Sequence, residues 1–341
     1  MSDFVQAYRR KPDLSFLIAG IASSLLFLSI FLSFAFLLPV QIVFGRKGGR
    51  SGMAATGVSA AGISVAQAAR LFAAGGFSPA DGRLTWLLAL AGGIAVPVVL
   101  LLALALINAP IGRRWDHAYR LLGVTALCVL IAIPAFVAFE RDSSLTSFLE
   151  EEIGNFLKPL RSAVADSSEG YDASVLAASL DPKDLVATSL ELLRNSMAAM
   201  LFAFLAGSWW LGNRLTGRGF PGWKRTAALD ELRLPYPFLW AFLGAWGFLL
   251  AEMAFKARGL VSAVTWNCAL IVTLAYAGVG LGIVSYLLKK WNTPKPLRVC
   301  LAILAVMALA TPIGIAVVII LPVTGVTEIW IHYRKPKGVG A

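Results

Sequence analysis

The feature that most constrains this chain is a series of long apolar runs separated by short polar stretches. Seven of them have roughly the 20 residues, or more, that an α-helix needs to cross the hydrocarbon core of a bilayer. They lie at 14–44, 84–107, 118–139, 195–213, 236–255, 260–288 and 299–323. Because a segment inside a bilayer must satisfy its own backbone hydrogen bonds, these runs predict membrane-spanning helices.

The composition agrees with an integral membrane protein, since 58% of the residues are hydrophobic and only 14% are charged. An eighth run, 53–74, is rich in Ala and Gly, so we expect other helices to surround it if it crosses. The predicted fold class is an all-α, polytopic transmembrane bundle of 7–8 spans with a small acidic helical insertion. The first run is too long for a cleaved signal peptide and is expected to stay in the protein.

The insertion, residues 140–188, carries ten acidic residues against four basic ones. Within it, apolar residues recur at helical spacing and predict an amphipathic helix over 143–165, with Ser147 and Glu150 resembling a capping box. Asp181-Pro182 predicts the start of the next helix. We interpret the insertion as a helical hairpin on the outer end of the bundle; docking of a partner or of the membrane surface is the alternative.

The chain therefore divides into four predicted parts. They are an N-terminal transmembrane half of 3–4 spans, 1–139; the acidic insertion, 140–188; a C-terminal transmembrane half of 4 spans, 189–333; and a basic tail, 334–341.

The net charge of +11 comes from basic clusters beside helix ends, which is typical of membrane topology and argues against a nucleic-acid partner. Three clusters, Arg113/Arg114/Arg120, Arg214 to Arg233 and Lys289 to Arg298, alternate around the spans and are expected to be cytoplasmic. Lys256, Arg258 and the tail Arg334, Lys335 and Lys337 then fall on the other side.

Glu252 is the most informative polar residue, because it lies in the apolar stretch "FLLAEMAFKARG", 248–259. One interpretation is an ion pair with Lys256 one turn later, which reaches the membrane interface. The other is a substrate pocket, since Asn267 and Trp266 enter the membrane from the same side and Trp246 precedes them. We hypothesise that Glu252, Asn267, Trp266 and Trp246 line a pocket for a small polar ligand that opens to the non-cytoplasmic side.

Other chemistry has weak support in the sequence. Cys128, Cys268 and Cys300 lie in apolar runs without Cys-x-x-Cys spacing, and the chain has only two histidines, so no metal or cofactor site is expected. The stretch "GRKGGRSG", 45–52, lacks the Gly-Lys-Ser/Thr ending of a P-loop. Gly278-x-x-x-Gly282 is interpreted as a helix-packing motif. No catalytic residue is assigned, and an enzyme is not expected.

Several stretches carry a resemblance to a known family. "LRLPYPFLW" (232–240), "AGVGLGIVSY" (277–286), "GVTEIWIHYRK" (325–335) and "LLPVQIVFGRKGGRSG" (37–52) resemble the YybS-like family of bacterial multi-pass membrane proteins. Glu328, Trp330 and Arg334 match an acidic, an aromatic and an Arg position of that family. The resemblance implies a multi-pass protein of the bacterial cytoplasmic (inner) membrane and implies no activity.

A more distant similarity is to the substrate-binding membrane subunits of energy-coupling-factor transporters, which capture a small molecule and dock on a separate ATPase module. Their first helix carries an Ala-x-x-x-Ala contact, whose nearest equivalents here are Ala19-x-x-x-Ser23 and Gly20-x-x-x-Ser24. We therefore expect a small-molecule transport component that lacks its own ATPase and needs an energising partner. The alternative is a membrane scaffold or envelope-assembly protein that docks a partner through the 143–165 helix.

Overall fold

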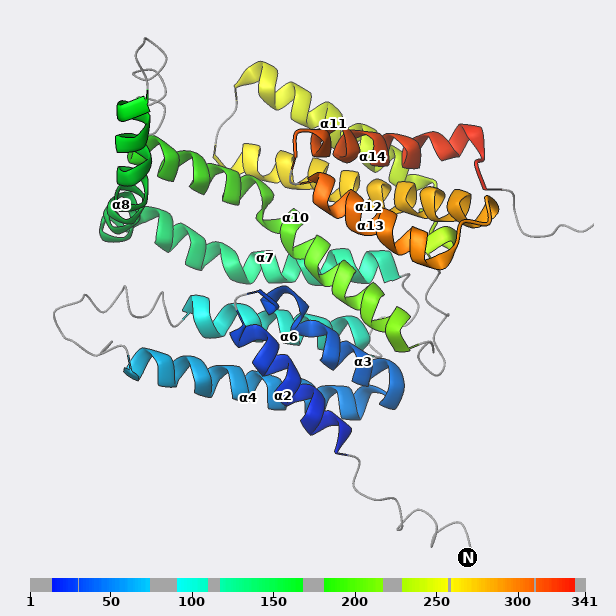
Figure 1. Cartoon of the computed structure of the whole chain (residues 1–341), viewed down its shortest axis with the longest axis horizontal. Coiled ribbons are helices and arrows are strands. Elements are labelled where there is room, and N and C mark those ends of the chain that lie inside the picture. Colours follow the sequence, from blue (N-terminus) through cyan, green and yellow to red (C-terminus); the bar gives the residue numbers. More distant parts are fainter. Residues whose placement is uncertain are drawn as a thin grey trace, which may run out of the picture. The chain divides into compact units, whose positions relative to one another are not determined.

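The computed structural model describes residues 14–29, 31–73, 91–109, 117–167, 181–216, 229–256, 259–309 and 311–334. Every regular element in these ranges is a helix, so the all-α prediction is confirmed (Figure 1). The chain forms two compact units. Unit 1 contains 1–197 and 204–224; unit 2 contains 198–203 and 225–341. The predicted C-terminal half, 189–333, therefore contributes to both units.

Unit 1 contains seven α-helices and two short helical elements in its described residues. They are α2 (Ser15–Leu28), η1 (Ser33–Ala35), α3 (Leu37–Lys47), α4 (Gly49–Ala73), η2 (Ala91–Ala95), α6 (Val96–Asn108), α7 (His117–Arg141), α8 (Ser143–Ser167) and most of α10 (Pro182–Thr216). Residues 198–203 of α10 belong to unit 2, together with η3 (Leu229–Glu231), α11 (Pro237–Phe255), α12 (Leu260–Lys290), α13 (Lys295–Leu309) and α14 (Ile313–Ile331).

Five of the described helices are long and apolar enough to cross a membrane. They are Tyr119–Ala138, Pro182–Thr216, Pro237–Phe255, Leu260–Lys290 and Gly314–Ile331. The first four match the predicted spans 118–139, 195–213, 236–255 and 260–288. Two shorter apolar helices, Ser15–Leu28 and Gly92–Asn108, correspond to parts of the runs 14–44 and 84–107, and residues 84–90 lie outside the described ranges.

The prediction of one continuous span over 14–44 is wrong. The helix α2 ends at Leu28, where Ser29 adopts an extended conformation, and the chain turns through η1 into α3. Pro39 lies in the first turn of α3, the part of a helix that tolerates a residue without an N–H group, and it would break a helix continued from α2. The rings of Phe27 and Phe36 meet at 5.2 Å near the tip of this hairpin.

Small residues let α4 run alongside α2 at close range. A Cβ atom on Gly20 would lie 2.6 Å from Val58, and one on Gly62 would lie 2.5 Å from the Ser24 hydroxyl. The Ser23 and Ser59 hydroxyls are 2.6 Å apart. The prediction that other helices surround the weak 53–74 run agrees with the contacts of α4 with α2, α3 and α6.

The predicted span 299–323 is also wrong as one continuous helix, because the chain turns between α13 and α14. Pro312 precedes the first residue of α14, and the Thr311 hydroxyl donates to the Ala308 carbonyl at 2.7 Å. The two helices pack against each other as a hairpin. As a result, Arg334 returns to the end of unit 2 that carries Lys289, instead of lying on the opposite side.

The helix predicted over 143–165 is present as α8, which begins at Ser143 as predicted and ends at Ser167. Ser147 therefore lies inside the helix, and the predicted capping box is wrong. The predicted start of α10 is confirmed, since Pro182 is its first residue and the Asp181 carboxylate accepts from the N–H of Lys183 at 3.1 Å. Near the other end of the insertion, Glu140 pairs with Arg194 at 3.3 Å. Residues 168–180 lie outside the described ranges.

Candidate functional site

The four residues of the hypothesised pocket all lie on α11 and α12 in unit 2. Asn267 binds the backbone of α10: its Oδ1 accepts from the N–H groups of Ala198 and Ala199 at 2.8 and 3.2 Å. Its Nδ2 donates to the Ala263 carbonyl at 2.7 Å. A side-chain carbonyl that takes two N–H groups in the middle of a helix explains a bend, and α10 changes direction along its length in Figure 1.

The other three residues have different surroundings. The Trp246 indole N–H donates to the Thr273 hydroxyl at 3.1 Å, and Trp266 is half-buried on α12. Glu252 is half-buried, and its Oε2 atom is buried with no hydrogen-bond partner among the described residues. Neither Lys256 nor Asn267 pairs with this carboxylate within that part of the chain, so the structure does not support the interpretation of Glu252 as the partner of Lys256 in an ion pair.

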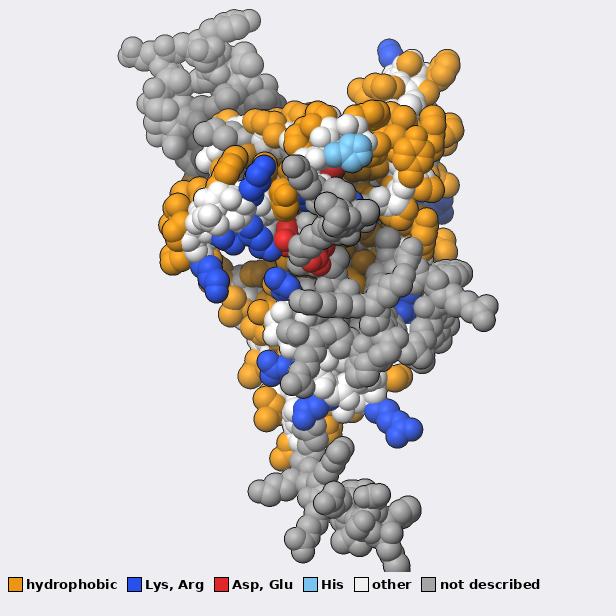
Figure 2. All heavy atoms as spheres, turned by 90° about the vertical axis from the view of Figure 1, so that its right-hand side faces the viewer, with side chains coloured by type: hydrophobic (Ala, Val, Ile, Leu, Met, Phe, Trp, Pro, Cys, Tyr) orange, Lys and Arg blue, Asp and Glu red, His pale blue; other side chains and the backbone are white. Residues whose placement is uncertain are grey.

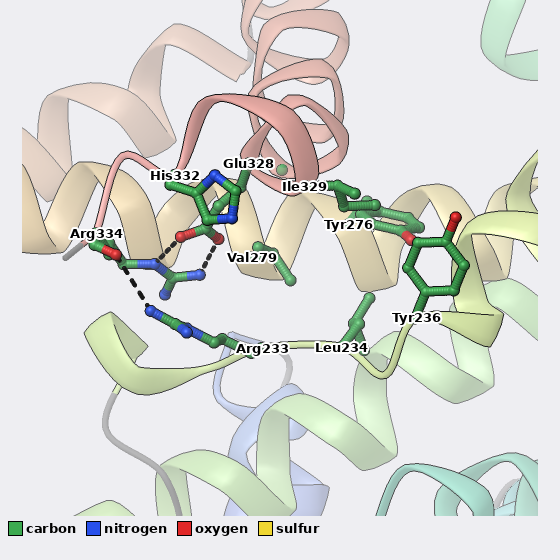
Figure 3. Close-up of a pocket in the computed structure, with 10 residues that line it drawn as sticks. Arg233, Leu234, Tyr236, Tyr276, Val279, Glu328, Ile329, His332 and Arg334 are labelled. Atoms are coloured by element: carbon green, nitrogen blue, oxygen red, sulfur yellow. Dashed lines mark hydrogen bonds and ion pairs between the residues drawn. The ribbon is translucent and has the colours of Figure 1, made fainter. Parts of the chain in front are cut away.

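A pocket lies at the opposite end of unit 2, between the start of α11, the second half of α12 and the end of α14. Its volume is about 200 Å³. None of the four predicted residues lines it. Its wall consists of Arg233, Leu234, Tyr236, Tyr276, Val279, Gly325, Glu328, Ile329, His332 and Arg334. Figure 3 shows the charged groups at one end of this pocket and Tyr236 and Tyr276 at the other.

A buried ion pair forms the charged end of the pocket. Arg334 is 2% exposed and Glu328 is 12% exposed at their side chains. The Arg334 Nε donates to Glu328 Oε1 at 2.5 Å, and Nη2 donates to the other carboxylate oxygen (Figure 3). This two-point geometry is typical of strong arginine–carboxylate recognition. His332, at the end of α14, adopts a left-handed conformation with φ of 46°, which turns the chain from Glu328 back to Arg334.

The segment between η3 and α11 is tied to this ion pair. Arg334 Nη1 donates to the Asp230 carbonyl at 3.1 Å, and Arg233 Nη2 donates to the Arg334 carbonyl at 3.2 Å. Lys289 of α12 pairs with the Asp230 carboxylate at 2.6 Å. Figure 2 looks onto this end, where basic side chains gather around acidic ones and an imidazole.

Glycines bring the helices of the pocket together. A Cβ atom on Gly280 would overlap the Leu321 carbonyl, and one on Gly325 would overlap the Tyr276 carbonyl, so α12 and α14 cross in backbone contact. Gly282 faces the Leu229 carbonyl of η3, and Gly278 lies near Leu232. The predicted Gly278-x-x-x-Gly282 motif is thus a packing motif, although its partner is the short 229–232 segment that contains η3 rather than a second long helix.

Unit 1 contains a separate polar cluster, Gln41, Asn108 and Asn213. Gln41 Nε2 donates to Asn213 Oδ1 at 2.8 Å and to Asn108 Oδ1 at 3.2 Å, and Asn108 Nδ2 returns a bond to Gln41 Oε1 at 2.6 Å. Gln41 and Asn108 are buried. Because these amides satisfy one another, the cluster holds α3, α6 and α10 together and offers little to a ligand.

The sequence patterns did not predict the pocket, although several of its residues lie in the stretches that resemble the YybS-like family. Glu328 and Arg334 matched family positions, and Tyr236 lies in "LRLPYPFLW". The spacing of six residues between Glu328 and Arg334 does not place them on one helical face. The left-handed turn at His332 brings them together, and that turn has no glycine to reveal it. Within the described residues, no group of three or more His, Cys, Asp or Glu side chains could hold a metal ion.

Comparison with known proteins gives one match. A family profile described as "Predicted membrane protein (DUF2232)" matches residues 84–324, which is more than two thirds of the chain. No curated protein and no solved structure matches the chain.

Proposed function

The chain belongs to the DUF2232 family of predicted membrane proteins, and from this premise we propose that it is a small-molecule transport component of the bacterial cytoplasmic membrane. The observation that carries the proposal is the pocket of unit 2, because it combines a fixed ion pair with aromatic and apolar walls. A mostly apolar cavity with a few convergent polar groups is the usual form of a small-molecule site. No catalytic step is part of this proposal.

The distribution of charge supports a cytoplasmic orientation of the pocket. The described residues at its end of unit 2 include six basic side chains, Arg233, Lys289, Lys290, Lys295, Arg298 and Arg334. The connection between α11 and α12, at the opposite end, has only Lys256 and Arg258. Because cytoplasmic ends of membrane proteins are enriched in Lys and Arg, the pocket would open inward. This differs from the hypothesis of a site open to the outside.

The same proposal includes an energising partner. Residues 45–52 are the stretch most similar to a phosphate-binding loop, but they lack the Gly-Lys-Ser/Thr ending of a P-loop, so the proposal assigns ATP hydrolysis to another protein. The similarity to energy-coupling-factor subunits has little structural support. Ala19, Gly20, Ser23 and Ser24 are buried against neighbouring segments, and Val58 and Ser59 of α4 contact the last three of them. The partner module would have to dock elsewhere. The YybS-like resemblance is compatible with the family match and adds no substrate.

Retention of a ligand by the purified full-length protein tests the proposed function. Leu234→Trp would fill the pocket, and Leu281→Trp is the matched control, because Leu281 lies on α12 but is 44% exposed and does not line the pocket. Native mass spectrometry after mild extraction should show a small molecule on the wild type and on Leu281→Trp, and none on Leu234→Trp. Equal retention by all three proteins would refute a ligand site at this pocket.

The pocket hypothesised around Glu252, Asn267, Trp266 and Trp246 remains a separate prediction. One observation still supports a ligand at that position: the Oε2 atom of Glu252 is buried and has no hydrogen-bond donor among the described residues. If a ligand binds there, Glu252→Gln should lower its retention, whereas Leu234→Trp should not. The two substitutions therefore separate the two sites in the same experiment.

A scaffold role is the second candidate, and the exposed apolar side of α8 favours it. Phe156 is 80% exposed and Phe148 is 54% exposed, whereas Leu157 on the other side of the helix is buried. Acidic residues Glu150, Glu151 and Glu152 lie beside them, so a partner would be apolar with a basic rim. Phe148→Ser/Phe156→Ser should abolish crosslinking of α8 to its partner in the host membrane and leave ligand retention unchanged. Crosslinking that survives this double substitution would exclude the scaffold role of α8.

A further inference from the structure

We propose that the ligand of the unit 2 pocket is a phosphate-bearing amphiphile from the cytoplasmic leaflet, with its anionic group at Arg233 and its apolar part beside Tyr236 and Tyr276. This inference rests on the proposed function, since it names the chemical class that the same pocket would bind. Three properties of the pocket support it: its positive charge, its small volume and its position at the membrane boundary.

The charge of the pocket is positive because one guanidinium is not neutralised. Glu328 neutralises Arg334, and Asp230 neutralises Lys289. Arg233 donates one hydrogen bond, to the Arg334 carbonyl, and has no carboxylate partner in the described part of the chain. A guanidinium carries five N–H donors in a fork that matches phosphate and carboxylate oxygens. Arg233 thus has donors left to bind an anion, while the Glu328–Arg334 pair holds the backbone carbonyl that positions it.

The size of the pocket suits a headgroup rather than a whole ligand. Its volume of about 200 Å³ is below the range of about 300–1,000 Å³ that is usual for pockets that enclose a drug-sized molecule. Three of its lining residues, Arg233, Tyr236 and His332, are exposed, so the cavity is open at the side. A bound molecule would place its anionic group inside and extend its remaining part along the protein surface. The separation of charged and aromatic ends in Figure 3 fits such a two-part molecule.

The helix lengths place the pocket at the membrane boundary. The helix α11 has 19 residues, about 28 Å at 1.5 Å per residue, which matches a hydrocarbon core of about 30 Å. Tyr236 directly precedes α11 and therefore lies where this core begins. Exposed aromatic residues Tyr236, Trp240 and Trp330 occur at the same end, as in the aromatic belts of membrane proteins.

Phosphate on an apolar body could come from a bilayer lipid or from a soluble phosphate ester. The level of the pocket and its open side favour the lipid, because the cytoplasmic leaflet is rich in anionic headgroups and basic pockets between helices bind them. A soluble ester would need no aromatic belt beside the site. The two sources can be distinguished by competition with an excess of a soluble phosphate ester, which should displace a bound ester but not a bound lipid.

The test measures which lipid the full-length protein retains. Protein in a mild detergent is exposed to phosphatidylglycerol or phosphatidylcholine with the same acyl chains, and native mass spectrometry counts the bound lipid. We expect the wild type to retain phosphatidylglycerol, and Arg233→Gln to retain it about tenfold less. Arg50→Gln, the same change at an exposed arginine of unit 1, should retain it like the wild type. An excess of glycerol phosphate of about 100-fold should not displace the lipid.

Three results would overturn the inference. The first is equal loss of phosphatidylglycerol in Arg233→Gln and Arg50→Gln, which would indicate general electrostatics. The second is equal retention of both lipids by the wild type. The third is displacement by glycerol phosphate, which would assign the site to a soluble ester and leave the proposed function intact. Failure of the proposed function itself would show separately, as unchanged ligand retention in Leu234→Trp. Tyr236→Ala, on the apolar wall, is a second variant that should lower retention of phosphatidylglycerol if Arg233→Gln does not fold.

Discussion

The Glu328 carboxylate and the Arg334 guanidinium lie at the centre of the charged end of the pocket, where each satisfies the other. Glu328→Gln would leave the Arg334 charge buried without a counter-charge. We expect it to cost about 3–5 kcal/mol of stability, since breaking one partner of a buried pair is costly. Lys289→Gln breaks a pair whose lysine is 42% exposed and should cost about 1 kcal/mol or less. Thermal unfolding in detergent compares the two, and similar losses would contradict the special role of the buried pair.

The Asn267 side chain stabilises α10 rather than the pocket, because its carbonyl oxygen accepts hydrogen bonds from two backbone N–H groups of that helix. Asn267→Ala removes this acceptor and should cost about 1–3 kcal/mol. The amides of Ala198 and Ala199 should then exchange hydrogen faster, which mass spectrometry of the α10 peptide measures. Thr265→Val is the control, because the Thr265 hydroxyl donates to carbonyls of its own helix. Unchanged exchange in Asn267→Ala would mean that the two N–H groups find other partners.

At the scale of the elements, the crossing of α12 and α14 depends on Gly280 and Gly325. Gly325→Ala would push its Cβ atom into the Tyr276 carbonyl, so the helices must separate and the pocket between them must change. We expect a loss of about 1–3 kcal/mol, as for other overpacked sites. Gly247→Ala on α11 has open space around it and should gain up to about 1 kcal/mol. Unfolding temperatures of the two variants that change in the same direction would refute this contrast.

The sequence predicted the elements better than it predicted their ends. Long uninterrupted runs such as 118–139 and 260–288 form single helices, because an apolar run of this length is sufficient to specify one membrane-spanning helix. The runs 14–44 and 299–323 contain breaks at Ser29 and near Pro312 that hydropathy does not reveal. The pocket was missed for a related reason. It forms only when the turn after α13 and the left-handed residue His332 bring Arg334 beside η3, and both depend on tertiary packing.

At the scale of the whole molecule, the charge argument predicts a topology. In a cysteine-free background, Asn292→Cys and His332→Cys should react with an impermeant maleimide only from the cytoplasmic side, and Lys256→Cys only from the opposite side. The reason is that α13 and α14 form a hairpin, so the ends of α12 and α14 share one face. A single crossing between α12 and the tail would place the thiols introduced at positions 292 and 332 on opposite sides and would overturn this arrangement.

The hairpin of α2 and α3 has a consequence for the biogenesis of the protein. As residues 14–44 leave the ribosome, their apolar length is sufficient for the insertion machinery to treat them as one crossing. In the folded protein, α2 has 14 residues, about 21 Å, too short to cross the core, and its small-residue face is completed by Ser59 and Gly62 of α4. The apolar length of 14–44 is therefore divided between α2 and α3 in the folded protein, and the surface that covers the small-residue face of α2 exists only once α4 has been synthesised.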